Sequence, residues 1–272
     1  MAEEVTGPRK VGLRDIARMK RDGQKLVVVT AYDVLFARLV DAAGVDVVLV
    51  GDSLGNVVAG FETTLPVTVE QMIYHAQAVR RGVKRALLVV DMPFLSYQSS
   101  REAAILNCGR VLKETEADAV KVEGGGPEMI DTISVLTRIG IPIVAHLGFT
   151  PQSVRTIGMR VQGRAAVDAT RMVEQAKSLE EAGAFALVLE LIPAELAARI
   201  TEAVTIPTIG IGAGPGCDGQ VLVLPDLLGL NDGFAPRFLK RYADLATAVR
   251  EAVGRFGNEV RSGEYPDAEH SN

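Results

Sequence analysis

The stretch Asp41-Ala-Ala-Gly-Val-Asp-Val-Val-Leu-Val50 contains the pattern that decides the fold. A helix-like segment ends at a glycine, and a short apolar run of Val and Leu follows it. Glycine suits the left-handed position that terminates a helix. A continuous apolar run of this length indicates a strand that is buried on both faces, as the strands of parallel sheets are. The stretch therefore predicts a helix followed by a parallel strand.

The same pattern recurs along the chain, with a glycine ahead of further apolar runs at Gly82, Gly140 and Gly183. We predict eight strands, near residues 26–31, 46–51, 86–91, 118–123, 141–146, 185–190, 206–211 and 220–224. The predicted helices lie near residues 34–43, 68–81, 99–115, 127–138, 167–182 and 194–203, with an additional helix over 11–22 and a closing helix over 235–256. Two helices start with the spacing of a capping box, Thr68 with Gln71 and Ser99 with Glu102.

Eight strands that alternate with helices form either a closed barrel or an open, doubly wound sheet. The chain has no G-x-G-x-x-G motif that opens the helix directly after the first strand, and no G-x-x-x-x-G-K-[ST] motif, so the closed (β/α)8 barrel, a TIM barrel with an extra N-terminal helix, is favoured. A single barrel typically has about 250 residues, and no low-complexity linker divides this chain of 272. We expect residues 1–10 to be a disordered tail and residues 11–272 to be one catalytic domain.

The composition argues against several classes of partner. The net charge is −5 and no basic tract is present, so we expect no nucleic-acid partner. No stretch approaches the roughly 20 apolar residues that span a bilayer, and the N-terminus has no secretory apolar region. The two cysteines, Cys108 and Cys217, have neither disulfide-framework nor metal-site spacing. A cytoplasmic protein without a membrane partner is predicted.

Polar side chains end or follow five of the predicted strands: Asp52 with Ser53, Asp91, Lys121 with Glu123, His146, and Glu190. The carboxyl ends of barrel strands converge on one mouth, where catalytic groups lie. Three carboxylates brought together there would raise one another's pKa values. A hard divalent cation relieves that repulsion, and ligands that are all oxygen suit Mg²⁺. In the alternative interpretation, each carboxylate caps a helix or lies in a solvated loop.

The other strand-end residues each allow more than one role. Lys121 points to the same face as Glu123 and either holds a substrate oxygen, pairs with a carboxylate, or forms a Schiff base in a metal-free reaction. Glu190 suits a general base, or else pairs with an arginine or caps the helix over 194–203. His146 has either a chemical or a structural role. The glycine-rich run 210–216 either binds phosphate or only turns tightly, and segment 148–166 is long enough for a lid.

Several motifs in this order resemble the ketopantoate hydroxymethyltransferase family. They are Thr30-Ala-Tyr-Asp33, Val50-Gly-Asp-Ser-Leu-Gly55, Thr64-Leu-Pro-Val67, Asp91-Met-Pro-Phe94, Val120-Lys-Val-Glu-Gly-Gly125, His146-Leu-Gly-Phe-Thr-Pro-Gln-Ser153, Val161-Gln-Gly-Arg164 and Ile209-Gly-Ile-Gly-Ala-Gly214. The ending Glu269-His-Ser271 is also similar, and the resemblance runs from about residue 11 to the end of the chain.

The resemblance implies a barrel of the phosphoenolpyruvate/pyruvate type in pantothenate biosynthesis, the route to coenzyme A. Such an enzyme moves a hydroxymethyl group from 5,10-methylenetetrahydrofolate to 3-methyl-2-oxobutanoate and forms 2-dehydropantoate through a Mg²⁺-stabilised enolate. It further implies a homodecamer. The family's metal positions fall on Asp52, Asp91 and Glu123, its substrate-contacting positions on Asp52, Ser53, Asp91 and Lys121, and its proton acceptor on Glu190. His146 is an additional candidate for substrate binding.

Two other classes of protein remain as alternatives. One is a metal-dependent lyase or mutase of the isocitrate lyase and phosphoenolpyruvate mutase kind, which also has acidic strand ends but commonly uses a cysteine in a Lys-Lys-Cys-Gly-His loop that this chain lacks. The other is a catalytically dead oligomeric binding protein. The presence of Asp52, Asp91, Lys121, Glu123 and Glu190 argues against such a relic.

Overall fold

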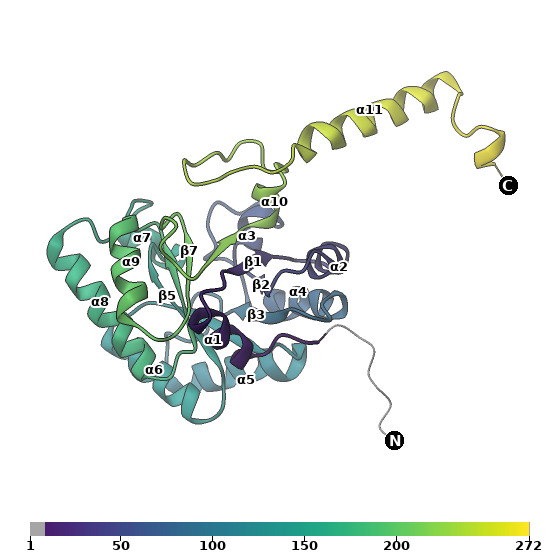
Figure 1. The fold of residues 1–272 in the computed structure, drawn as a ribbon. Coiled ribbons are helices and arrows are strands. Elements are labelled where there is room, and N and C mark those ends of the chain that lie inside the picture. The colour runs from purple at the N-terminus through teal and green to yellow at the C-terminus, as the bar shows by residue number, and fades with distance from the viewer. Residues whose placement is uncertain (1–8, 272) are drawn as a thin grey trace. The chain divides into compact units, whose positions relative to one another are not determined.

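The computed structural model describes residues 9–271 (Figure 1). The described chain divides into two compact units, one ending at Leu222 and the other beginning at Val223. The prediction of a disordered tail over residues 1–10 falls mostly on residues 1–8, which lie outside the described residues. The prediction that residues 11–272 form one domain stays a prediction, and the two units are described separately below.

The first unit is a closed barrel of eight parallel strands in chain order. The strands are β1 (Leu26–Thr30), β2 (Val47–Val50), β3 (Leu87–Asp91), β4 (Ala119–Glu123), β5 (Ile143–Gly148), β6 (Ala186–Glu190), β7 (Thr208–Ile211) and β8 (Gly219–Leu222). Strand β8 pairs with both β7 and β1 and so closes the ring. All eight predicted strands and the closed barrel are confirmed, although β8 ends two residues earlier than predicted.

Helices lie around the barrel in the order expected for repeated strand–helix units. They are α1 (Leu13–Arg21), α2 (Val34–Ala42), α3 (Leu54–Val57), α4 (Val69–Gly82), α5 (Arg101–Thr115), α6 (Pro127–Arg138), α7 (Val154–Ile157), α8 (Ala166–Glu181) and α9 (Ala194–Ala203), with a 3₁₀ turn, η1 (Pro151–Ser153), before α7. The predicted bounds of α6 and α9 are correct at both ends. The extra helix α1 is also confirmed: Ile16 is buried in the same apolar cluster as Leu26 and Leu87, which begin β1 and β3.

The helix-termination signals are correct at three of four glycines. Gly44, Gly140 and Gly183 have positive φ angles, as the left-handed position after a helix requires. Gly82 instead lies inside the last turn of α4, where an added Cβ would collide with Ala37 of α2. Glycine is present there because two helices approach closely, not because the backbone turns.

One of the two predicted capping boxes is present. The Thr68 hydroxyl accepts from the Gln71 amide, and the Gln71 side chain accepts from the Thr68 amide. The prediction for Ser99 is wrong by one residue, because Ser100 adopts the extended backbone of an N-cap and its hydroxyl accepts from the Ala103 amide. Two adjacent serines offer two possible caps, and the helix start selects the second.

Strand periodicity explains why polar groups gather at the barrel mouth. Val89, Ala119, Val144 and Val188 belong to the central apolar cluster. Side chains two residues apart lie on the same face of a strand. The next residues on those faces are therefore Asp91, Lys121, His146 and Glu190, in that order. On each of these strands, the side chains that face the barrel interior are apolar until the carboxyl end of the strand, where a polar side chain follows.

The second unit contains α10 (Leu224–Leu227), α11 (Leu245–Ser262) and the 3₁₀ turn η2 (Ala268–His270). The predicted closing helix over 235–256 is correct in type but wrong at its start. The Arg241 guanidinium donates to the carbonyls of Asn231, Asp232 and Phe234 and holds this stretch as a loop. The Asp244 side chain then caps α11. Among the residues described, no helix is both long and apolar enough to cross a membrane.

Candidate active site

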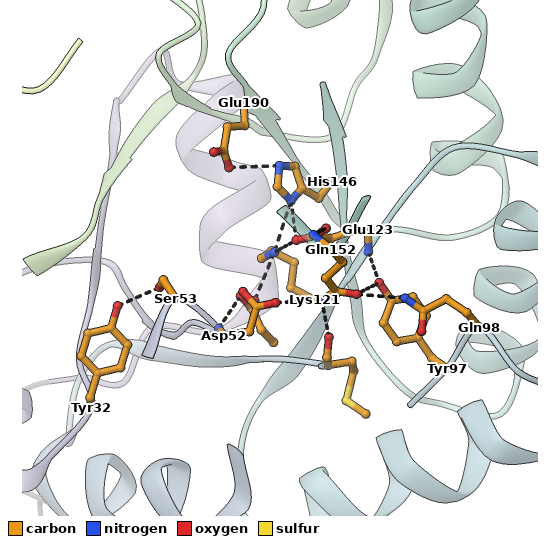
Figure 2. Close-up of polar contacts among 12 residues, drawn as sticks. Tyr32, Asp52, Ser53, Tyr97, Gln98, Lys121, Glu123, His146, Gln152 and Glu190 are labelled. Atoms are coloured by element: carbon orange, nitrogen blue, oxygen red, sulfur yellow. Dashed lines mark hydrogen bonds and ion pairs between the residues drawn. The ribbon is translucent and has the colours of Figure 1, made fainter. Parts of the chain in front are cut away.

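The predicted site residues come together at the carboxyl ends of β2 to β6 (Figure 2). Asp52 and Ser53 follow β2, Asp91 ends β3, Lys121 and Glu123 lie in β4, His146 lies in β5, and Glu190 ends β6. The side chains of Ser53 and Glu190 are partly exposed, whereas the other five residues are buried. One face of the cluster is therefore open to a ligand.

Lys121 is the cation at the centre of this cluster. Its ammonium lies 3.3 Å from Asp91 Oδ1 and 3.7 Å from Glu123 Oε1. Burial alone would lower the pKa of Lys121, but the carboxylates of Asp91 and Glu123 outweigh burial and raise it. A Schiff-base lysine must be neutral to act as a nucleophile. The raised pKa therefore argues against that alternative and in favour of a fixed positive charge.

Each of the three carboxylates has one oxygen anchored by a protein hydrogen bond. Asp52 Oδ2 accepts from the Gln152 side-chain amide, Asp91 Oδ2 from the Asp52 backbone amide, and Glu123 Oε2 from the Gln152 backbone amide. Asp91 Oδ1 and Glu123 Oε1 are buried and have no hydrogen-bond partner in the described part of the chain. Lys121 is an ion-pair partner of both oxygens, at 3.3 and 3.7 Å, but leaves their hydrogen-bonding capacity unused, which is costly for buried oxygens. The anchored carboxylates therefore present two acceptors to a further positive charge.

The raised pKa of Asp52 also indicates an excess of negative charge in the site. Burial, followed by the charges of Glu123 and Asp91, raises the pKa of Asp52 to about 8. Burial also raises the pKa of Asp91, although Lys121 opposes it. One cation, Lys121, therefore does not neutralise the three carboxylates. The alternative that Asp52 caps the following helix is wrong, because α3 has no side-chain cap.

The donor set fits a hard divalent cation, with one restriction. Within residues 9–271, no three Asp, Glu, His or Cys side chains converge closely enough to enclose an ion by themselves. Mg²⁺ usually keeps several waters and takes only one or two carboxylates together with a ligand's oxygens. A site made of Asp52, Asp91 and Glu123 therefore fits such a partly hydrated ion and does not fit a closed protein cage.

His146 stands between the acidic cluster and Glu190. Its Nδ1 lies 3.3 Å from Lys121 Nζ and 3.5 Å from Glu123 Oε1, and its Nε2 lies 3.4 Å from Glu190 Oε2. Burial lowers the pKa of His146, but its contacts with the two carboxylates raise it overall. Helix α9 has no side-chain cap, so the alternative that Glu190 caps this helix is wrong. The Glu190 carboxylate is positioned at the exposed edge of the site.

The end of β5 needs a glycine beside Glu190. Gly148 pairs with Glu190 across the two strands and has a φ of +99°. An added Cβ would collide with the Glu190 carbonyl oxygen. Any other residue at 148 would strain the backbone and displace the carboxylate that the pairing positions.

Three residues of the site were not predicted from the sequence. The Tyr32 hydroxyl lies 2.8 Å from Ser53 Oγ, the Tyr97 hydroxyl donates to Gln152 Oε1, and Gln152 contacts two of the carboxylates. All three lie outside the strands, so the strand pattern carried no signal for them. Tyr32 and Gln152 lie within motifs that resemble the family, but nothing in those motifs assigned them a role, and Tyr97 lies outside them.

The glycine-rich run 210–216 packs against a helix. An added Cβ on Gly214 would collide with Ala194, and one on Gly216 would lie 3.0 Å from the Ala198 Cβ. Both alanines belong to α9. Of the two alternatives for this run, these contacts support the tight turn, with glycine required for close approach to α9.

The Asp52 carboxyl predicts a pH dependence of stability in a chelating buffer. Its pKa is about 8 in the folded chain against 3.8 ordinarily, so folding takes up a proton between these values. Stability then falls as pH rises through this window, by at most about 1.4 kcal/mol per pH unit. Asp52→Asn should flatten that slope in urea unfolding at pH 5, 6.5 and 8, whereas Asp131→Asn, on the exposed face of α6, should not. Equal slopes for Asp52→Asn and the unsubstituted protein would contradict the raised pKa.

Comparison with known proteins identifies the family. Residues 10–268 match the ketopantoate hydroxymethyltransferase family. Proteins called 3-methyl-2-oxobutanoate hydroxymethyltransferase are 56% identical in Picosynechococcus sp. (94% of this chain, 98% of the relative) and 53% identical in Prosthecochloris aestuarii (96% of each). These matches span nearly the whole of both chains.

Solved structures support the fold independently. Phosphoenolpyruvate phosphomutase from Streptomyces platensis subsp. rosaceus has a TM-score of 0.62 at 13% identity, covering 93% of this chain and 88% of its own. Phosphonopyruvate hydrolase, solved with oxalate and Mg²⁺, has a TM-score of 0.61 at 13% identity, covering 95% and 92%. At such identities the likeness concerns the fold alone. The function follows from the closer relatives: the chain belongs to the ketopantoate hydroxymethyltransferase family and is a transferase.

Proposed function

We propose that this enzyme transfers a hydroxymethyl group from 5,10-methylenetetrahydrofolate to 3-methyl-2-oxobutanoate, forming 2-dehydropantoate in the first committed step of pantothenate biosynthesis. The observation that carries the proposal is the buried Lys121 among Asp52, Asp91 and Glu123, with Glu190 at the exposed edge. A 2-oxo acid has adjacent carboxylate and keto oxygens, which suit a site that combines a fixed cation with a bound metal.

The residues that would hold Mg²⁺ are Asp52, Asp91 and Glu123. When bound, the ion supplies Lewis acidity, which makes the C3 proton of the oxo acid more acidic and stabilises the enolate charge. Asp91 Oδ1 and Glu123 Oε1 support this assignment, because both lie buried in the site without a hydrogen bond from the described residues and share the single ammonium of Lys121.

The chain's own groups account for the remaining steps. Lys121 and Ser53 bind the oxo acid's oxygens, with Ser53 held by Tyr32. Glu190 takes the C3 proton on Oε2 or Oε1, and the electron pair left on C3 forms a bond to the methylene carbon of the folate as one of that carbon's two C–N bonds breaks. Water then replaces the second folate nitrogen and supplies the hydroxyl group, and the C3 proton and the remaining proton of the water go to the two nitrogens of the tetrahydrofolate that leaves. His146, 3.4 Å from Glu190 Oε2, orients the base. A positioned general base of this kind contributes about 10²–10⁴-fold to a rate.

The lyase or mutase alternative rests on the fold alone. The solved structure of 2,3-dimethylmalate lyase, a member of that superfamily, has a TM-score of 0.59 but is only 16% identical to this chain. Cys108 is buried within α5, and Cys217 is buried between β7 and β8, so neither is an accessible nucleophile. Cleavage of 2-methylisocitrate in the absence of folate would favour this alternative.

The exchange of one proton tests the proposal. The C3 proton of 3-methyl-2-oxobutanoate should disappear from the NMR spectrum in D₂O when enzyme and Mg²⁺ are both present. Omitting Mg²⁺, or adding a chelator, should stop the loss. No exchange with Mg²⁺, either alone or with tetrahydrofolate added, would contradict the proposed substrate class. Exchange that appears only with tetrahydrofolate would instead mean that enolisation waits for the second substrate.

Family resemblance also leads us to propose a cytoplasmic homodecamer. The second unit supports assembly: Val249, Val253, Phe256 and Val260 are large apolar side chains exposed along α11. Their spacing of three to four residues puts them on one face of the helix. Sedimentation velocity of the full chain tests the stoichiometry, and a monomer at micromolar concentration would contradict it.

A further inference from the structure

Gln152 lies outside the strands but contacts two of the three carboxylates of the site. It lies in η1, the first turn of the segment between β5 and α8, and it is 5% exposed. Its side-chain amide donates to Asp52 Oδ2 at 2.9 Å and to the Met92 carbonyl at 2.8 Å. Its backbone amide donates to Glu123 Oε2 at 3.1 Å. One residue therefore contacts two carboxylates, one that follows β2 and one that ends β4.

The direction of every bond in this network is determined. The Glu123 backbone amide donates to the Tyr97 hydroxyl at 2.9 Å, so the hydroxyl proton is free to donate to Gln152 Oε1 at 2.8 Å. Gln98 donates to the same Oε1 at 2.9 Å. With its oxygen occupied by two donors, the amide has to direct its NH₂ group at Asp52.

We propose that Gln152 is a positioning residue of the active site: it fixes the carboxylates of Asp52 and Glu123 so that a divalent cation meets them already oriented. It anchors one oxygen of each carboxylate and leaves Glu123 Oε1 buried without a hydrogen bond from the described residues, with Lys121 and His146 at ion-pair distance. Tyr97 holds Gln152 in turn, so the polar chain Glu123–Tyr97–Gln152–Asp52 runs across the site (Figure 2).

This inference rests on the proposed function, because it assumes a cation at the three carboxylates. Groups that orient metal ligands from outside typically contribute about 10–100-fold to metal affinity. The η1 turn lies within segment 148–166, which the sequence predicts to be long enough for a lid, so the position of that segment and the orientation of the carboxylates are linked through one side chain.

Gln152→Met tests the side-chain bonds alone. Methionine has the same length but no donor, and the backbone amide that contacts Glu123 survives the change. We expect the Kd for Mn²⁺, measured by EPR of the free ion on the full-length protein without substrate, to rise roughly 10–100-fold. Gln77→Met makes the same change on α4, where the Gln77 side chain donates to the Glu114 carbonyl at 3.0 Å, and should shift the Kd by less than about twofold.

The proton-exchange assay supplies a second readout. In Gln152→Met, the Mg²⁺ concentration for half-maximal exchange should rise with the Mn²⁺ Kd, and saturating Mg²⁺ should restore most of kcat. Tyr97→Phe keeps Gln152 but removes its fixed donor, so the Kd should move in the same direction by a smaller factor. If Gln152→Met does not fold, as judged by circular dichroism, Tyr97→Phe decides instead.

The outcomes separate the two proposals. An unsubstituted protein that binds no Mn²⁺ would overturn the metal site, and this inference with it. If Gln152→Met binds Mn²⁺ as tightly as the unsubstituted protein does, the role of Gln152 is overturned and the proposed function stays intact. Where Gln152→Met does not fold, equal binding by Tyr97→Phe and the unsubstituted protein has the same meaning.

Discussion

Replacing Glu190 with glutamine is expected to slow exchange of the C3 proton of 3-methyl-2-oxobutanoate by roughly 10³-fold, because the variant lacks the proton acceptor. Glutamine has the same shape, and its amide can keep the contact with His146 Nε2 that the carboxylate makes at 3.4 Å. The acidic cluster and Lys121 stay unchanged, so KM for the oxo acid and the Kd for Mn²⁺ should both stay near their original values. Loss of kcat alone is the signature of a group that acts in the transition state.

Glu195→Gln is the matched control for this experiment. Glu195 is an exposed carboxylate in the first turn of α9, five residues beyond Glu190. Its replacement removes the same charge without touching the site, and exchange should continue at the original rate. If Glu190→Gln retained exchange within about tenfold, another group would be the acceptor, and His146 would be the nearest candidate.

The parts of the fold that were predictable are those in which a local pattern determines the structure. The apolar runs that begin with Val47 and Leu87 are buried strands whatever surrounds them, and glycines such as Gly44 and Gly140 end helices by their own backbone angles. The misplaced elements depend on distant contacts. The predicted start of α11 at residue 235 was wrong because Arg241, inside the predicted helix, donates to the carbonyls of Asn231, Asp232 and Phe234 and closes residues 231–241 into a loop. Periodicity does not reveal such an interaction.

The same distinction applies to the site. Asp91, Lys121 and Glu190 could be predicted because each continues the inward face of a buried strand. Tyr97 and Gln152 lie in the connections after β3 and β5, and the path of a connection depends on what it packs against. Both are buried, bond to each other and contact the residues that bear the carboxylates. The sequence predicted which strands supply charge but not which loops hold that charge in place.

Replacing Lys121 with methionine is expected to have a comparably large effect through a different cause. Methionine fills the space, but Asp91 and Glu123 lose the cation that lies 3.3 and 3.7 Å away. Removing one partner of a buried ion pair costs about 3–5 kcal/mol. In a chelating buffer at pH 7.5, the midpoint of thermal unfolding should therefore fall by roughly 10 °C. Without a fixed cation for the oxo acid, kcat/KM for exchange should fall by at least about 10³-fold.

Adding a divalent metal should separate the loss of thermal stability in Lys121→Met from its loss of proton exchange. An ion bound at Asp52, Asp91 and Glu123 replaces the missing positive charge, so Mg²⁺ should stabilise Lys121→Met against heat more than it stabilises the unsubstituted protein, while exchange stays low. Lys20→Met is the control, because Lys20 makes a 3.0 Å ion pair with Asp218, which precedes β8, and should lose stability without this extra response to metal. Recovery of exchange by Mg²⁺ in Lys121→Met would mean that the ion alone binds the oxo acid. An equal response of both lysine variants to Mg²⁺ would mean that the ion does not replace the charge of Lys121, and would place the metal away from Asp52, Asp91 and Glu123.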